Sequence, residues 1–372
     1  MNLSAEDNLR INVLLAQKLQ AVRIDESKMI VYALTDRGEA RVPLNPNCKD
    51  EKYIREIKAV FSNHVMGSPG GYPVYLKRWT RMGQAREETL SQLLLLGEPE
   101  AVVAAVHAKG LTDELAERAW WAMPCAENAR RMLEKDAVVS GKTGRVLAEF
   151  LLEFLPFEED QRAMIESVRL VLQPGLISEA ERDSLWKRAQ TRRSFYVGFL
   201  HTLPDDLPGE TPARDDVDSL AEKLAPLIES GNAVAALLLR CHSAHGQAFL
   251  LTAEAALAKL SDQQVVESLF DAIAGYFSAA RTANCALDNI ERICAEADAR
   301  CEQCSAELTA LLQCVPELKH EVRALLVLSS LSVYLLNPVF ALTDAVGTVM
   351  RKKIKHLTDP ILEQLAVLQG KG

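Results

Sequence analysis

The first part of the chain changes its hydrophobic period, which predicts a small unit of helices and strands. Apolar residues recur every three or four positions over 4–20, and Ser4 is a plausible helix cap at the start. Residues 29–34 are β-rich, and after a turn signal apolar residues alternate over 40–44, so we expect a β-hairpin. A second helix is predicted from about residue 50 to 63.

Beyond residue 84 the pattern becomes a series of short helices separated by glycine, proline or capping residues. Segments such as 99–110 and 112–134 resemble a helix pair of the HEAT or armadillo type, although no strict period is present. The stretch 203–213, LPDDLPGETPA, holds three prolines, one glycine and three acids, which predicts a linker.

The predicted fold class is therefore mainly α, an irregular α-solenoid or helical-bundle array that follows a small N-terminal α+β unit. We expect an α+β unit over 1–85, a helical hairpin array over 86–203, a linker over 204–216 and a C-terminal helical domain over 217–372.

Composition and charge narrow the function classes. The 372 residues are 48% hydrophobic and 25% charged, which is typical of a globular protein and excludes overall disorder. A net charge of −9 argues against a general nucleic-acid binder, because such proteins are normally basic. The N-terminus does not have the pattern of a secretory signal, and eight unevenly placed cysteines favour reduced thiols. We expect a cytoplasmic protein.

One apolar segment, Ala324 to Thr343, is 20 residues long and carries no charge, which is the length that a membrane span needs. Three serines, the pair Asn337-Pro338 and basic residues on both sides argue against a span. The sequence therefore favours two buried helices that meet at Asn337-Pro338, and membrane association is the alternative.

The segment Ser68 to Gln84 concentrates turn formers, aromatic residues and cations. Flat rings beside fixed positive charge suit an anion or an acidic protein surface. The predicted contact residues are Tyr72, Tyr75, Lys77, Arg78, Trp79 and Arg81. The structural alternative, in which the rings pack under the hairpin and the cations stay in water, fits the sequence equally well.

Five cysteines fall between residues 285 and 314, and they include the pair Cys301-x-x-Cys304. Apolar residues and cysteines alternate at spacings of three and four from 287 to 311, which predicts the seam of one long helix. Zinc sites place paired cysteines in tight loops, so we predict no metal site. Sulfur handling by Cys301 and Cys304 is the alternative.

Three further motifs suggest chemistry but have simpler structural explanations. His242 and His245 lie three residues apart and are expected to be cations near a helix C-terminus. The run 140–143, SGKT, resembles the end of a phosphate-binding loop, but Asp136 stands where the first glycine belongs. The basic run 351–355 is predicted to be a solvated face, with an acidic partner or a membrane surface as the alternative. We predict no bound cofactor.

The opening LSAEDNLRINVLLAQKLQ, the following IDESKMIVYALTDRGEA and the segment 68–84 resemble the DsrS family of sulfur reduction proteins, and the likeness extends over most of the chain. The resemblance implies a cytoplasmic accessory of the dissimilatory sulfite reductase system, with partners among the sulfite reductase and sulfur-relay proteins. It implies no catalytic residues. We therefore expect a non-catalytic scaffold or regulator that acts by protein–protein interaction. The alternative is a sulfur-handling protein that uses Cys301 and Cys304 as a persulfide or a dithiol.

Overall fold

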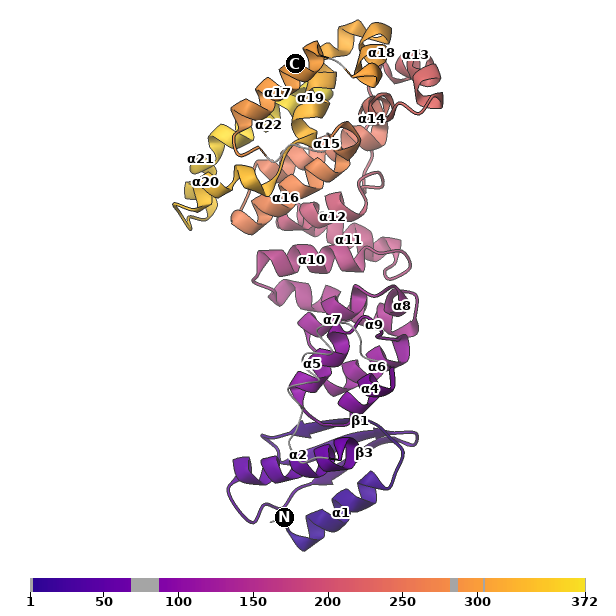
Figure 1. The fold of residues 1–372 in the computed structure, drawn as a ribbon, viewed down its shortest axis with the longest axis vertical. Helices are drawn as coiled ribbons and strands as arrows, with labels where there is room; N and C mark the ends of the chain where they lie inside the picture. The colour runs from indigo at the N-terminus through magenta and orange to yellow at the C-terminus, as the bar shows by residue number, and fades with distance from the viewer. Residues whose placement is uncertain (1–2, 68–86, 282–286, 304, 372) are drawn as a thin grey trace. The chain divides into compact units, whose positions relative to one another are not determined.

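The computed structural model describes residues 3–67, 87–281, 287–303 and 305–371 (Figure 1). The described chain is mostly helical and carries one three-stranded antiparallel sheet near the N-terminus. It divides into two compact units, Met1–Pro156 with Gln173–Ile177, and Phe157–Leu172 with Ser178–Gly372. The predicted mainly helical class with a small N-terminal α+β part is confirmed.

The N-terminal α+β part contains the predicted hairpin and both predicted helices. Its elements are α1 (Ala5–Leu15), β1 (Leu19–Asp25), β2 (Ile30–Thr35), β3 (Gly38–Pro43) and α2 (Asp50–Met66). The strands pair in the order β1-β2-β3, and Ser4 caps α1 by accepting a hydrogen bond from the backbone N–H of Asp7. The expected helix over 4–20 is too long, because α1 ends at Leu15 and Leu19 pairs with Thr35 as the start of β1.

One face of the sheet packs against α1 and α2. Its core includes Val22, Val31 and Val42 from the three strands, together with Ile11 and Phe61 from the two helices. The opposite face is partly covered as well, because Ala21 of β1 is also completely buried and α6 (Asp113–Ala122) contacts β1.

A buried polar contact lies beside this core. Asp7 is fully buried, and its Oδ2 accepts hydrogen bonds from the hydroxyl of Tyr53 and from the backbone N–H of Asn45. Burying a carboxylate is costly unless such donors reach it, so these bonds fix the start of α1 against α2.

Short helices complete the first unit. They are α4 (Glu87–Leu93), α5 (Pro99–His107), α6 (Asp113–Ala122), α7 (Ala126–Leu133), α8 (Asp136–Val139) and α9 (Lys142–Phe154), followed by the 3-10 turn η1 (Leu155–Phe157). The backbone N–H of Val22 donates to the carbonyl of Leu94 over 2.9 Å, so the edge of β1 is held by the segment after α4.

Helices form the second unit almost entirely. They are α10 (Gln161–Val171), α11 (Glu179–Ala189), α12 (Ser194–Thr202), α13 (Val217–Glu229), α14 (Ala233–His242), α15 (Ala244–Leu257), α16 (Gln263–Tyr276), α17 (Ile290–Glu302), α18 (Ala306–Cys314), α19 (Lys319–Ser329), α20 (Asn337–Phe340), α21 (Gly347–Lys353) and α22 (Lys355–Leu368), with 3-10 turns η2 (Ser278–Ala280), η3 (Pro316–Leu318) and η4 (Val333–Leu335).

The segment 204–216, predicted as a linker, lies inside this second unit. Asp205 forms a two-bond ion pair with Arg240, with both oxygen–nitrogen distances at 2.6 Å, and the backbone N–H of Arg214 donates to the carbonyl of His242. The boundary between the two compact units lies at about residue 157, which is a different place from the predicted linker.

The apolar segment 324–343 is split between a buried helix and an exposed turn. Ala324 to Ser329 of α19 are completely buried, whereas the side chain of Leu342 is 86% exposed. Among the described residues no single helix is long and apolar enough to cross a membrane, although the bent pair Pro316–Ser329 and Val333–Phe340, with 81° between its halves, passes by length and composition. The predicted meeting point at Asn337-Pro338 is wrong, because the chain already bends after Ser329.

The run Ser140 to Thr143 forms the start of α9 and holds a carboxylate of its own chain. The backbone N–H groups of Lys142 and Thr143 donate to the two carboxylate oxygens of Asp113 at 3.0 and 3.1 Å. These amides are the groups that would otherwise bind a phosphate, so Asp113 occupies the place of an external anion.

This close contact yields a stability prediction. A Cβ atom added at Gly141 would lie 2.1 Å from the carboxylate carbon of Asp113, so Gly141→Ala must displace the capping carboxylate. We expect a loss of about 2 kcal/mol in the free energy of unfolding, measured by urea titration.

Gly275→Ala is the matched control, because nothing lies within 4 Å of the added Cβ in α16. Alanine is the better helix former, so this variant should be as stable as the parent or slightly more so. Equal stability of both variants would contradict the role of Asp113.

Candidate functional site

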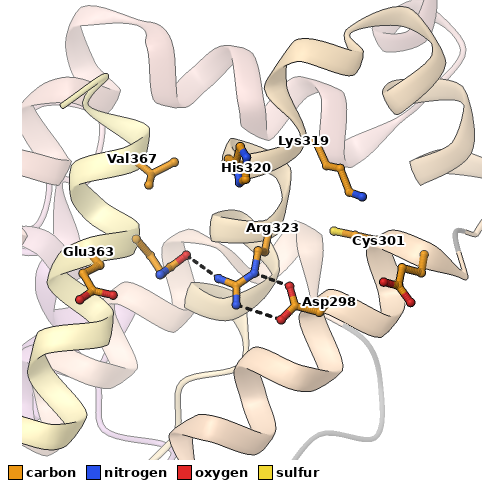
Figure 2. Close-up of a pocket in the computed structure, with 9 residues that line it drawn as sticks. Asp298, Cys301, Lys319, His320, Arg323, Glu363 and Val367 are labelled. Atoms are coloured by element: carbon orange, nitrogen blue, oxygen red, sulfur yellow. Dashed lines mark hydrogen bonds and ion pairs between the residues drawn. The ribbon is translucent and has the colours of Figure 1, made fainter. Parts of the chain in front are cut away.

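The principal candidate site is a half-open cavity of about 630 Å³ in the second unit, lined by residues of α17, α19 and α22 (Figure 2). Helices α17 and α22 both contact α19, so each supplies one wall. The residues that line it are Asp298, Cys301, Glu302, Lys319, His320, Arg323, Glu363, Gln364 and Val367.

Arg323 connects the three walls of this cavity. Its Nε and Nη2 donate to the two carboxylate oxygens of Asp298 on α17, at 2.5 and 3.1 Å, and its Nη1 donates to Oε1 of Gln364 on α22 at 3.1 Å. Figure 2 marks these bonds with dashed lines, and we call the group of Arg323, Asp298 and Gln364 the floor of the cavity. A two-bond pair of this kind fixes the guanidinium in one orientation.

The Arg323–Asp298 pair also sets the charge state of the floor. The hydrogen bond from Arg323 and its positive charge lower the pKa of Asp298, although burial acts in the opposite direction. In the same way the hydrogen bond to Asp298 raises the pKa of Arg323. The pair therefore stays ionised over the physiological range.

Charges of both signs surround the floor. Lys319 and His320 lie in the first turn of α19, Glu302 ends α17, and Glu363 comes from α22. Cys301 of α17 also lines the cavity, and it is only 6% exposed to solvent. A cavity with such a lining can hold a small polar molecule and present it to a thiol.

The cysteine-rich segment departs from the prediction of one long helix. The chain breaks between α17 and α18, where Ser305 caps α18 by accepting a hydrogen bond from the backbone N–H of Leu308. A serine that bonds to the backbone in this way competes with helix continuation, which explains the break.

The individual cysteines differ in exposure. Cys301 is buried, whereas Cys294 and Cys314 are partly exposed, and burial raises the pKa of the Cys294 thiol. Cys304 lies outside the described residues. Within the described part of the chain, no group of three or more His, Cys, Asp or Glu side chains is placed to hold a metal ion.

The predicted contact surface cannot be placed. Its members Tyr72, Tyr75, Lys77, Arg78, Trp79 and Arg81 all lie outside the residues that the structure describes.

The two histidines of the Cys241–His245 motif lie on different helices. His242 ends α14 and is completely buried, whereas His245 belongs to the first turn of α15 and is exposed. The Nδ1 of His242 lies 3.0 Å from Oδ1 of Asp216, and its Nε2 has no hydrogen-bond partner among the described residues. Burial and the nearby Arg214 cation lower the pKa of His242, and the Asp216 contact offsets this only in part. The expected cation is therefore a neutral imidazole.

Sequence reasoning missed the Arg323–Asp298 pair, because its members lie 25 positions apart on different helices. One signal was present. Asp298 falls between Cys294 and Cys301, at spacings of four and three, on the seam that the sequence had already marked. A charge at the edge of an apolar seam indicates a partner on the facing helix.

Comparison with protein-family models, with curated proteins and with solved structures finds no significant match to this chain.

The buried His242 gives the chain a pH-dependent stability. The unfolded state takes up a proton near the ordinary imidazole pKa of 6.5, whereas the folded state resists it. This contribution to stability is therefore complete above about pH 6.5 and is lost as the pH falls below that value.

We expect the free energy of unfolding to decline as the pH falls from about 6.5 to 5, and to decline less in His242→Gln, which cannot titrate. Urea titrations at several pH values measure both slopes. Burial lowers the pKa of His201 to about 4. This histidine is present in both proteins, so its contribution cancels when the two slopes are compared. If the free energy of unfolding changed with pH to the same extent in both proteins, His242 would not be the group responsible.

Proposed function

We propose that this chain is a non-catalytic accessory protein of dissimilatory sulfur metabolism that acts as a scaffold or regulator by binding other proteins. The observation that supports it is the packing of helices that follow one another in sequence. In the first unit the contacting pairs are α4–α5, α5–α6, α6–α7, α7–α8 and α8–α9, and in the second they include α11–α12, α13–α14, α14–α15 and α15–α16.

Such packing is compatible with an irregular α-solenoid of helix pairs, which we propose as the finer description of the fold. Arrays of this kind present long surfaces to protein partners. The place in sulfur metabolism rests on the resemblance to the DsrS family. On that basis we propose a cytoplasmic location and partners among the sulfite reductase and sulfur-relay proteins.

The proposed contact surface is the set of rings and cations between Tyr72 and Arg81. We expect the tagged chain to capture sulfite reductase or sulfur-relay proteins from an anaerobic lysate of cells that oxidise sulfur. Arg78→Ala with Trp79→Ala should abolish this capture, because it removes one fixed charge and the largest ring. Mass spectrometry of the captured proteins measures the effect.

A matched control is Arg292→Ala with Phe157→Ala, which removes an exposed arginine and a ring that is 75% exposed elsewhere in the chain. This control should capture the same partners as the parent chain. Equal capture by all three proteins would contradict the contact surface, and recovery of no sulfur-metabolism protein by the parent would contradict the accessory function.

The second candidate function is sulfur handling at Cys301 and Cys304. The specific observation in its favour is that Cys301 lines the cavity together with Lys319 and His320. In the proposed step the Cys301 thiolate attacks the outer sulfur of a donor persulfide. A new sulfur–sulfur bond forms, the donor leaves as its thiolate, and no external oxidant or reductant is needed.

Alkylation of the native protein separates the two functions. Cys241 is the internal reference, because it is completely buried and burial raises its pKa to about 12. If the chain is only a scaffold, Cys301 should resist iodoacetamide as Cys241 does until denaturant is added.

A sulfur-handling protein should instead show rapid alkylation of Cys301 in the native state and should gain one sulfur atom there after exposure to a persulfide donor. Peptide mass spectrometry reads both modifications. Protection of Cys301 with no added sulfur would rule out the second function.

A further inference from the structure

Exposed apolar side chains gather in the part of the second unit that follows the bend after α19. The exposed fractions are 86% for Leu342, 64% for Val346, 58% for Val349 and 52% for Tyr334. Large apolar side chains that stay exposed in one part of a fold make that part a candidate interaction surface.

This part of the chain is held in place by the connection between α15 and α16. The backbone N–H of Gly347 donates to the carbonyl of Ser261 over 2.6 Å, and Nη1 of Arg351 donates to the carbonyl of Leu260 over 2.8 Å. Met350 is completely buried on the inner side of α21. Figure 1 shows α20 and α21 at one end of the second unit.

Charges of opposite sign lie at the two ends of α21. Before its N-terminus is a cavity of about 370 Å³ whose charged lining residues are all acidic: Glu159, Asp160, Asp262 and Asp344. At its C-terminus Lys352 and Lys353 are exposed. Along α21 the surface therefore runs from acidic through apolar, at Val346 and Val349, to basic. We call this the α21 surface.

We propose that the α21 surface binds the α21 surface of a second copy of this chain, with the two α21 helices antiparallel about a two-fold axis near Val349. In that arrangement apolar residues meet apolar residues, and the acidic end of each copy faces the basic end of the other. A two-fold contact needs this self-complementarity.

The charge pattern favours a second copy over other occupants. An anionic lipid surface would be attracted by Lys352 and Lys353 but repelled by Asp344 and the acidic cavity beside it. A protein partner whose surface carries charge of only one sign would likewise be repelled by one end of the α21 surface. Another copy satisfies both ends with the same contact, and its presence does not depend on the function proposed above.

Charge reversal tests the proposal on the full chain by sedimentation equilibrium at low salt. One variant carries Lys352→Glu with Lys353→Glu, and the other carries Glu159→Lys with Asp344→Lys. Asp160 and Asp262 stay unchanged because they cap α10 and α16. The parent should form dimers. Each variant alone should be monomeric. The first places like charges opposite each other at both ends, and the second cancels the net negative charge that the lysines of the other copy would face.

The equimolar mixture is the decisive sample. In a heterodimer of the two variants the introduced glutamates of one copy face the introduced lysines of the other, and the native acids and lysines face each other at the other end, so the mixture should recover dimers. Val349→Ser should weaken the parent dimer at least tenfold, since it removes apolar contact at the axis. Higher salt should weaken the parent dimer as well.

Two variants serve as controls. Lys109→Glu with Lys142→Glu changes the net charge equally in the first unit, and Val146→Ser removes a valine that is 49% exposed on α9. Both should dimerise as the parent does, and circular dichroism should show all variants folded.

Three results would overturn the proposal. One is a parent chain that stays monomeric at low salt, and another is a mixture that does not recover dimers. The third is binding of the parent to phosphatidylglycerol vesicles in place of self-association, which would assign the surface to lipid.

Discussion

The second unit is organised by the complete burial of the second half of one helix, α19. Every residue of α19 from Ala324 to Ser329 is inaccessible to solvent, and α14, α16, α17 and α22 all contact this helix. A helix that is apolar on all sides has no polar face to turn toward water, so its neighbours must surround it. Its last carbonyl groups still need donors, and Nε of Arg281 supplies one to Ser329 over 2.8 Å.

The opposite end of α19 has the opposite character. Lys319, His320 and Arg323 begin the same helix and line the cavity. Arg323 stands directly before the buried run, where an unpaired cation would be costly, and the Asp298 carboxylate and the Gln364 amide satisfy it. The cavity floor is thus a consequence of placing a charged turn beside a fully buried one.

The sequence predicts those elements whose signals are local. The Ser4 cap, the hairpin of β2 and β3 and the helix α2 all follow from residues within a few positions of one another. The exposure of Leu9 and Val13 on α1 does not follow, because these apolar residues share the helical spacing of a buried face. Asp7, Ile11 and Leu14 face the core instead, and only the position of the sheet decides this.

The candidate site was less predictable for a related reason. Its lining comes from α17, α19 and α22, which are separated by up to two other helices in the sequence, and periodicity says nothing about which helices become neighbours. Periodicity correctly marked Cys301 as a buried seam position. It also suggested that the seam continues as one helix, because it does not register a serine that can cap a new helix at Ser305.

The 20-residue apolar stretch from Ala324 illustrates how one composition can serve two purposes. Up to Leu336 most of its apolar residues are packed inside the unit, with Tyr334 as the exposed exception, and this packing accounts for their hydrophobicity without any external surface. After Leu336 apolar residues continue at Leu342 and, just past the end of the stretch, at Val346. Both side chains are exposed because the fold does not cover them. Burying a large aliphatic side chain is worth about 1.5–3 kcal/mol, and leaving it in water forgoes that gain. The second half of the stretch therefore differs from the first in what remains to be buried, and the acids before α21 and the lysines at its end make a copy of the same surface the best complement.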